Sequence, residues 1–301
     1  MPNSTWQTFW RKHTRLKQAL SHARDAVGSA PDSVTKCALP SQGCTIGIGH
    51  SHLMTFVYAQ QARIEQAQPM NVHFHWIQLQ DEDLNPNLVE NGGRVTLNPV
   101  LRRRLDRELA TLREAPPFLC ASISGNEFLY VGHTEHPRRF DFSLPERPDL
   151  TVRSGVEIIP PSLMRKTLER SMQHPLSIMT ALREATDIPI VFIQSPPPVM
   201  SGDFISGHAG PFREAIEENG VAPPSLRMKL WLLQSAIYRQ RGEELGCRYF
   251  EIPEEVLDAS GFLQETGSWP DSVHANAWYG EILLQKFEGE FRQSQPIEVS
   301  R

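Results

Sequence analysis

The sequence contains no apolar run long enough to cross a membrane. A transmembrane helix needs about 20 consecutive, mostly apolar residues, and no stretch of the 301-residue chain comes near that length. Residues 1–20 also carry basic side chains where a secretory signal peptide has its apolar core. We therefore expect a protein without a membrane span that is located in the cytoplasm.

Cysteine is scarce as well, and an excess of basic charge is absent. The chain has 4 cysteines and no C-x-x-C pair, which indicates a reducing setting. Cys120 and Cys247 lie in or beside apolar runs, so we expect both to be small buried side chains. The net charge is −5, whereas a nucleic-acid-binding domain normally carries a basic excess. We therefore expect no nucleic-acid partner.

The first residues have the pattern of a separate element. Residues 4–27 show helix-like apolar spacing, and the stretch 28–34, which contains Gly, Ser and Pro, indicates a linker. We predict an N-terminal helical arm with its linker over 1–36, one domain over 40–292, and a C-terminal tail over 293–301. Two interpretations of the arm stay open: a helix packed on the main domain, or a docking arm through which the chain forms a homo-oligomer.

From residue 44 onward, short apolar runs alternate with helix-like segments. The predicted strands are 45–49, 71–79, 116–124, 188–194 and 247–253. The predicted helices are 52–67, 99–113, 161–185, 224–244 and 275–291. Short apolar strands separated by helices indicate an α/β protein whose mostly parallel sheet, of about five strands, is covered on both faces. Ligands of such sheets bind beyond the carboxyl ends of the strands.

One segment interrupts this alternation. Residues from about 132 to 160 are rich in proline and charge and contain no clear apolar period. A connection of this length is uncommon in a compact domain unless it has a function. The segment is therefore predicted to be an inserted cap.

Three strand-end stretches carry side chains suited to acyl transfer. They are GHS at 49–51, SGNE at 124–127 and DSVH at 271–274. Nucleophilic acyl transfer needs a hydroxyl, a base, a group that orients the base, and hydrogen-bond donors for the oxyanion. Ser51 offers the hydroxyl and His274 the base, and Asp271 could orient the imidazole. Asn126 offers an amide donor, and glycine at 92 or 93 would let a backbone N–H approach the reacting carbonyl.

With these motifs, the stretch from about 44 to 288 resembles the SGNH (GDSL-type) hydrolases. The family is named for Ser, Gly, Asn and His in this chain order and has a three-layer, flavodoxin-like α/β/α fold. The resemblance implies Ser51 as nucleophile, His274 as general base and Asp271 as the orienting acid. It implies an oxyanion hole made by the Ser51 N–H, the Gly93 N–H and the Asn126 side chain, with no cofactor. The adjacent Gly92 leaves the choice of glycine open.

The chain departs from the family pattern at two positions. His50 stands where the family has an aspartate that helps to order the site, and Glu127 follows Asn126 where the family has an aspartate. We expect His50 to contact the substrate or to support the site from behind, and Glu127 to brace its loop by hydrogen bonds. Trp269 either lines the substrate pocket or simply packs.

Simpler interpretations exist for the same residues. Ser51 alone could be a helix N-cap, and Asn126 alone could be a turn residue. The histidines at 50, 52, 73 and 75 invite a metal site, but no H-E-x-x-H or C-x-x-C spacing supports one. We therefore expect no metal.

The combined motifs predict a serine-dependent ester hydrolase that acts through an acyl-enzyme. Its expected substrate is a small acyl ester, for example an O-acetyl or other short-chain ester, on a small molecule or a glycan. The first alternative is an O-acyltransferase that uses the same Ser-His-Asp site. The second alternative, from another class, is a catalytically impaired binding protein with the same fold.

Overall fold

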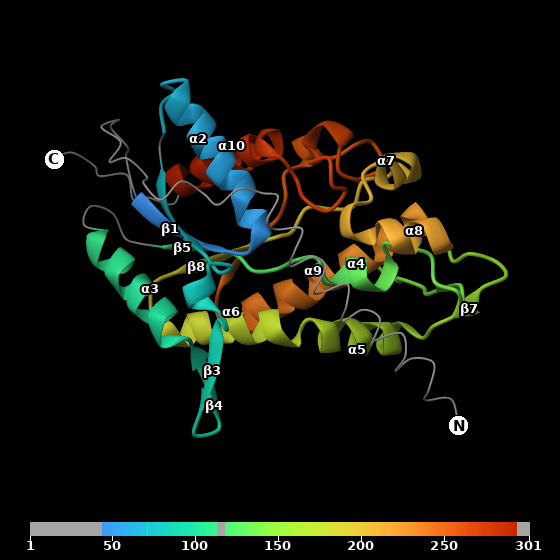
Figure 1. Ribbon diagram of the computed structural model, residues 1–301, viewed down its shortest axis with the longest axis horizontal. Helices are drawn as coiled ribbons and strands as arrows, with labels where there is room; N and C mark the ends of the chain where they lie inside the picture. The colour runs from blue at the N-terminus through green and yellow to red at the C-terminus, as the bar shows by residue number, and fades with distance from the viewer. Residues whose placement is uncertain (1–43, 71, 113–117, 294–301) are drawn as a thin grey trace.

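The computed structural model describes residues 44–70, 72–112 and 118–293 (Figure 1). The predicted N-terminal arm, and the predicted tail beyond residue 293, lie outside the described residues. Within the described residues, no helix has both the length and the apolar character needed to span a bilayer.

A five-stranded parallel sheet forms the centre of the molecule. Its strands are β1 (Cys44–Gly49), β2 (His73–Gln78), β5 (Leu119–Ser122), β8 (Ile190–Ile193) and β9 (Arg248–Phe250). They lie in the order β2-β1-β5-β8-β9, and every neighbouring pair is parallel. This is the flavodoxin-like strand order, so the predicted fold class is confirmed. The inner strands are apolar because helices cover both of their faces.

Helices form a layer on each side of the sheet (Figure 1). One layer contains α2 (Met54–Glu65) and α10 (Ala277–Gln293). The other contains α3 (Pro99–Thr111), α5 (Pro161–Ser171), α6 (Gln173–Ala185) and α9 (Pro224–Glu244). Gly280 of α10 allows close packing on α2, because a Cβ atom there would lie 2.0 Å from the carbonyl oxygen of Thr55. The predicted helix over 161–185 is two helices that meet at the buried Met172.

Part of the predicted loop after β2 is a hairpin. After a short 3-10 turn, η3 (Glu82–Leu84), strands β3 (Leu88–Asn91) and β4 (Arg94–Leu97) pair in antiparallel fashion. Gly92 and Gly93 join them with φ values of 59° and 80°. Two successive residues with positive φ are the signature of a tight hairpin turn that matches strand twist.

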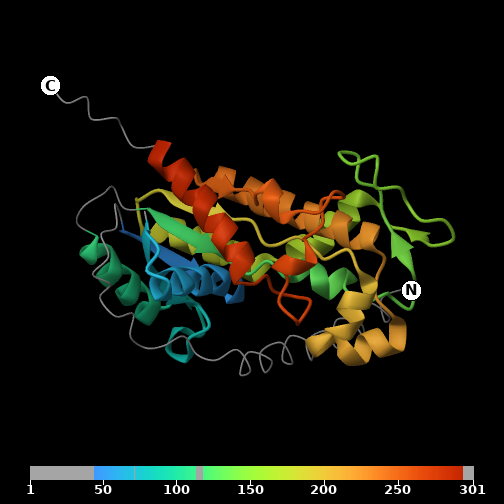
Figure 2. The same ribbon diagram turned by 90° about the horizontal axis from the view of Figure 1, so that it is seen from above.

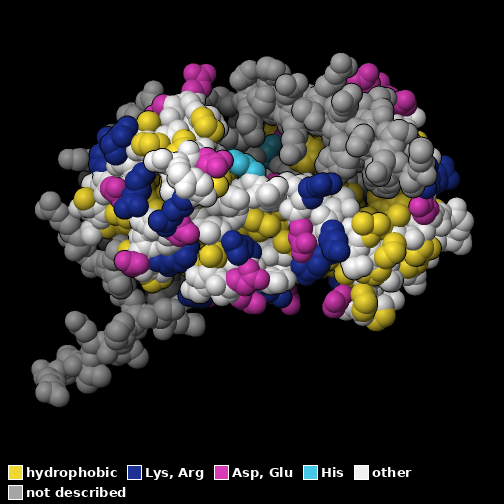
Figure 3. All heavy atoms as spheres, turned by 90° about the horizontal axis from the view of Figure 1, so that it is seen from below, with side chains coloured by type: hydrophobic (Ala, Val, Ile, Leu, Met, Phe, Trp, Pro, Cys, Tyr) yellow, Lys and Arg dark blue, Asp and Glu magenta, His cyan; other side chains and the backbone are white. Residues whose placement is uncertain are grey.

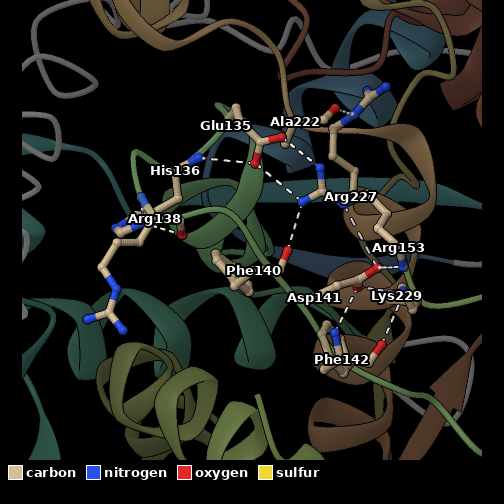
Figure 4. A network of polar contacts seen from close by, with 10 residues as sticks. All are labelled: Glu135, His136, Arg138, Phe140, Asp141, Phe142, Arg153, Ala222, Arg227 and Lys229. Atoms are coloured by element: carbon tan, nitrogen blue, oxygen red, sulfur yellow. Dashed lines mark hydrogen bonds and ion pairs between the residues drawn. The ribbon is translucent and has the colours of Figure 1, made fainter. Parts of the chain in front are cut away.

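The predicted insertion, 132–160, begins at the end of α4 (Glu127–Gly132) and packs on α9 around a buried ion pair. Its two short strands, β6 (Phe140–Asp141) and β7 (Glu157–Ile158), pair in parallel. The carboxylate of Asp141 and the ammonium of Lys229, on α9, lie 2.5 Å apart, and both side chains are fully buried. Arg153 and Glu135 form a second pair at 2.7 Å (Figure 4). The Asp141–Lys229 pair anchors the segment to α9, whereas the Arg153–Glu135 pair joins two parts of the segment itself.

A second excursion, which the sequence analysis did not identify, lies between β8 and α9. It contains α7 (Gly202–Gly207), η4 (Gly210–Phe212) and α8 (Arg213–Asn219). In Figure 2 these short helices lie at the lower right, in light orange. Its backbone is joined to the first insertion, since Thr134 bridges Val221 and the N–H of Glu135 donates to the carbonyl of Gly220 at 2.9 Å.

Candidate active site

Ser51 lies at the carboxyl end of β1, where the strand turns toward α2. It begins the 3-10 turn η2 (Ser51–Leu53), and its side chain is partly buried. The ends of β1 and β5 are fastened together here, because the N–H of His50 donates to the carbonyl of Ser122 at 3.0 Å. A Cβ atom at Gly49 would lie 2.2 Å from the same carbonyl oxygen. Glycine at 49 therefore lets the two strand ends meet beneath Ser51.

Asp271 and His274 form a tightly held pair in the turn before α10. The Asp271 carboxylate lies 2.6 Å from Nδ1 of His274, and its other oxygen accepts the backbone N–H groups of Val273 (3.0 Å) and His274 (2.9 Å). Burial opposes ionisation of Asp271, but the hydrogen bond and attraction from His274 outweigh it and lower the pKa of the carboxyl group. The ionised Asp271 holds the imidazole proton at Nδ1, which leaves the lone pair at Nε2.

The Asp271–His274 turn faces the turn that carries Ser51. The ring centroids of His274 and His52 are 5.4 Å apart. The charges of His274 and Asp271 both act on the pKa of His52. Residues separated by more than 200 positions in the chain are therefore neighbours at this edge of the sheet.

His52 holds the side chain of Asn126, a contact that the sequence analysis missed. Nε2 of His52 lies 2.7 Å from Oδ1 of Asn126, and only 4% of His52 is exposed. Burial, reinforced by the nearby charge of His274, lowers the pKa of His52 to about 3. The neutral ring can then donate its Nε2–H to Oδ1, which directs the Asn126 amide N–H groups away from His52. The available signal was that both residues follow predicted strands of one parallel sheet.

Buried side chains hold the loop that carries Asn126 in place through hydrogen bonds. The buried Glu127 accepts hydrogen bonds from the Ser124 hydroxyl, the Gly125 N–H (3.2 Å) and the Tyr238 hydroxyl (3.0 Å). Burial raises the pKa of Glu127. The side-chain amide of Gln234, on α9, donates to the Gly125 carbonyl (2.8 Å) and accepts the N–H of Phe128 (2.7 Å). Glu127 is thus a brace, the role that the sequence indicated.

His50 ties the β1 turn to the same loop. Its Nδ1 accepts the backbone N–H of Ser124 at 3.1 Å. The side chain is partly exposed. His50 therefore supplies a hydrogen-bond acceptor at the position where the SGNH (GDSL-type) pattern has an aspartate.

The structure does not bring Gly93 to this site. Gly92 and Gly93 form the turn of the β3–β4 hairpin, which projects away from the sheet (Figure 1). A Cβ atom at either glycine would meet nothing within 4 Å. The assignment of the Gly93 N–H to the oxyanion hole is therefore wrong, because these glycines serve the positive φ of the turn.

Trp269 packs against α2. Its ring stacks on that of Tyr58 with centroids 5.7 Å apart and an interplanar angle of 16°. Its backbone N–H donates to the carbonyl of His274 at 2.7 Å. Trp269 therefore fixes the His274 turn against α2.

A hollow lies beside His274. Besides His274, its lining includes His133, Arg227 and Ser272 in a mostly apolar wall that contains the prolines at 196–198. The first insertion contributes only His133 to the lining, whereas the segment after β8 contributes the prolines, Val199 and Ile205. The segment after β8 thus contributes more of this wall than the predicted cap does.

Histidine side chains are visible in the recess of the face shown in Figure 3, where basic and acidic side chains are interspersed. In the described part of the chain, no group of three or more His, Cys, Asp or Glu residues is arranged to hold a metal. His73 and His75 share β2, with ring centroids 5.7 Å apart, and His75 lies 3.1 Å from a carboxylate oxygen of Glu108.

No protein-family model and no curated protein matches the chain. Among solved structures, it is similar to a GDSL-like lipase from Bacteroides thetaiotaomicron, with 9% identity, a TM-score of 0.42, and coverage of 93% of this chain and 98% of that one. It is also similar to the periplasmic domain of a lipopolysaccharide acetyltransferase from Salmonella ser. Paratyphi A, with 14% identity, a TM-score of 0.43, and coverage of 97% and 98%. Likenesses at this level carry no functional argument, so function must be argued from the residues of the site.

Proposed function

We propose that the protein is a serine-dependent ester hydrolase with Ser51 as its nucleophile. The observation that carries the proposal is the 2.6 Å contact between Asp271 and His274, in a turn that faces the 50–52 turn at the carboxyl end of β1. Serine acyl transfer requires an acid that fixes the tautomer of a histidine close to the nucleophilic hydroxyl. The half-buried Asp271 is placed to act on His274 in this way.

In the proposed reaction, Nε2 of His274 takes the proton from the Ser51 hydroxyl as Oγ attacks the ester carbonyl. The tetrahedral intermediate collapses to an acyl-enzyme when the alkoxide leaves with that proton. Water, deprotonated by the same nitrogen, then releases the acid and restores Ser51. The Ser51 N–H and the Asn126 amide are the donors proposed for the oxyanion, and the His52 contact supports this role by fixing the orientation of Asn126.

Covalent labelling tests the proposal directly. The wild-type protein should react with a fluorophosphonate, and mass spectrometry should locate the adduct on Ser51. Ser51→Ala should lose the adduct and lower kcat for 4-nitrophenyl acetate by about 1,000-fold or more, since removal of a nucleophile costs several orders of magnitude. Ser154→Ala, at an exposed turn of the insertion, is the matched control. A folded wild-type protein with no adduct on Ser51 would contradict the proposal.

The same assay separates hydrolysis from transfer to a hydroxyl acceptor. Product analysis with and without an added alcohol or sugar shows whether the acyl group leaves as the free acid or as a new ester. A hydrolase gives the free acid in both cases. Predominant formation of the new ester would assign the site to an O-acyltransferase.

A further inference from the structure

Three lysine or arginine side chains are buried among the described residues: Arg63, Arg227 and Lys229. Two of them lie against carboxylates. Arg63 pairs with Glu281 at 2.7 Å and with Glu288 at 2.9 Å, and Lys229 pairs with Asp141 at 2.5 Å. No carboxylate in the described part of the chain lies within 4.0 Å of Arg227, although its side chain is fully buried.

Within the described residues, the guanidinium of Arg227 makes its hydrogen bonds to uncharged backbone groups. It donates to the carbonyl oxygens of Ala222 (3.0 Å), Val199 (2.5 Å) and Met200 (2.8 Å). In Figure 4 its side chain points toward Ala222 and away from Asp141. Burial lowers the pKa of Arg227 to about 10, so it keeps its charge at neutral pH. An arginine has five N–H donors, and three such bonds leave capacity for a further acceptor.

Arg227 lines the hollow beside His274, together with a second group that has an unused nitrogen. His133 is 1% exposed, and its Nδ1 has no hydrogen-bond partner in the described structure. Its Nε2 lies 3.3 Å from the Ser272 hydroxyl. Burial, with the Arg227 charge in addition, lowers the pKa of His133 to about 3, so the ring is neutral. If the Ser272 hydroxyl donates to Nε2, Nδ1 carries the proton and becomes a donor.

The other lining residues are mostly apolar and include Phe128, Leu129 and the prolines at 196–198. Charges interact strongly in such a setting because little water screens them. A buried charge without a counter-charge is costly, and native proteins normally pair it. Arg227 thus lacks a counter-charge at the hollow that His274 also lines. This hollow has room for about one water-sized group, so only the charged end of a ligand could enter it.

We propose that this hollow is a subsite for an anionic group, a carboxylate or a phosphate, on the alcohol portion of the ester, and that Arg227 is its counter-charge. This inference rests on the proposed function, in which His274 gives its proton to the leaving alcohol and so has the alcohol at its side. The substrate class is then an acyl ester of an acidic alcohol. The alternative is that Arg227 only fastens the 199–222 segment through its three carbonyl contacts.

Matched aryl acetates separate the two roles. The probes are 3-acetoxybenzoate, 3-acetoxyphenyl phosphate and the neutral 3-acetoxybenzamide, and the readout is kcat/KM for each. Wild type should prefer at least one anionic probe over the amide by about 10-fold or more, as expected for a charge-assisted contact. The comparison of the two anions identifies carboxylate or phosphate as the preferred group. Equal kcat/KM for all three probes would overturn the proposal.

Variants of the lining test the assignment to Arg227. Arg227→Gln should lower kcat/KM for the anionic probes relative to the amide and so remove the preference, and Arg227→Lys should keep part of it. A preference that survives unchanged in folded Arg227→Gln would also overturn the proposal. If Arg227→Gln does not fold, His133→Phe provides the test, because it leaves the three carbonyl contacts of Arg227 in place. It should reduce the preference about 3-fold or more, and an unchanged preference would contradict the subsite.

Calorimetry distinguishes failure of this inference from failure of the proposed function. The Ser51→Ala protein is titrated with 3-hydroxybenzoate, 3-hydroxyphenyl phosphate and 3-hydroxybenzamide. If an anionic phenol binds about 10-fold more tightly than the amide, the result supports the subsite. This holds even if no ester is hydrolysed and the fluorophosphonate does not label Ser51. Binding without such a preference, or no binding of any of the three, overturns the subsite whether or not Ser51 is a nucleophile.

Discussion

Two clusters of polar side chains hold this molecule together in different ways. In the insertion cluster, Lys229 meets Asp141 and also donates to the carbonyl of Phe142 at 3.0 Å, while Arg153 meets Glu135. Each charge there has an opposite charge. The site cluster, made of His52, Asn126, Asp271 and His274, contains a neutral ring, His52, whose Nδ1 has no partner in the described structure. In the insertion cluster Nε of Arg153 also makes no hydrogen bond, but it lies 3.9 Å from the Asp141 carboxylate. Opposite charges thus hold the insertion in place, whereas hydrogen bonds orient the side chains of the site.

The largest effect should come from breaking the insertion cluster. Lys229→Met would leave the carboxylate of Asp141 buried without its counter-charge. We expect this change to lower the free energy of unfolding by about 3–5 kcal/mol, measured by urea denaturation at pH 7. The rate of fluorophosphonate labelling should stay unchanged under conditions where the variant is folded.

The double variant Lys229→Met/Asp141→Asn is the control for that experiment. It removes both charges and should recover part of the lost stability, because a neutral amide is less costly to bury than an unpaired carboxylate. A slower labelling of Ser51 in the folded single variant would show that the insertion also supports the chemistry. The two clusters would then not be independent.

A change at His52 should have the opposite effect, because it should lower the reaction rate rather than the stability. His52→Leu removes the donor that orients Asn126, so we expect kcat for 4-nitrophenyl acetate to fall about 10- to 100-fold with little change in KM. The reason is that oxyanion donors act mainly in the transition state. His52→Gln keeps an N–H donor and should recover most of the rate. Equal losses in the two variants would indicate a packing role only.

The smallest effect, taken per pH unit, is the pH dependence of stability that two buried histidines contribute. The pKa of His52 and of His133 is lowered to about 3, from an ordinary value of 6.5. Below about pH 6.5 the unfolded chain binds protons that the folded protein does not, so stability is complete above that pH and is lost progressively toward about pH 3. Each histidine should contribute about 1.4 kcal/mol per pH unit within that window.

Urea denaturation at a series of pH values measures this slope. His52→Leu should reduce proton uptake on unfolding by about one proton between pH 5.5 and 4, relative to wild type. An identical slope in the two proteins would mean that the buried imidazole is already charged in the folded state. The comparison of slopes does not depend on the packing cost of the substitution, which shifts all values together.

Local sequence patterns predicted the sheet because each strand is a short apolar run between helical segments. Cys120 in β5, for example, is fully buried, as expected of a strand covered on both faces. The same reasoning placed Ser51 and Asn126 at strand ends, and parallel strands bring their carboxyl ends to one edge, so these two residues were predicted to lie near one another. The Asp271–His274 turn precedes α10 and does not end a strand, and its place at this edge was predicted from the family resemblance.

The Gly92–Gly93 pair shows where local pattern fails. Glycine permits both a close approach to a reacting carbonyl and the positive φ of a hairpin turn. Nothing in the sequence distinguishes the two uses. Only the antiparallel pairing of β3 with β4 assigned these glycines to the turn.

The sequence by itself determined the order of strands and helices and the chemistry available at the strand ends, because these depend on residues close together in the chain. Tertiary structure alone decided which polar groups became partners. His52 meets Asn126 across 74 positions, and Lys229 meets Asp141 while Arg227, two residues earlier on α9, meets no carboxylate in the described structure. Whether a side chain is buried and paired depends on the residues that pack against it, and here those residues come from distant parts of the chain.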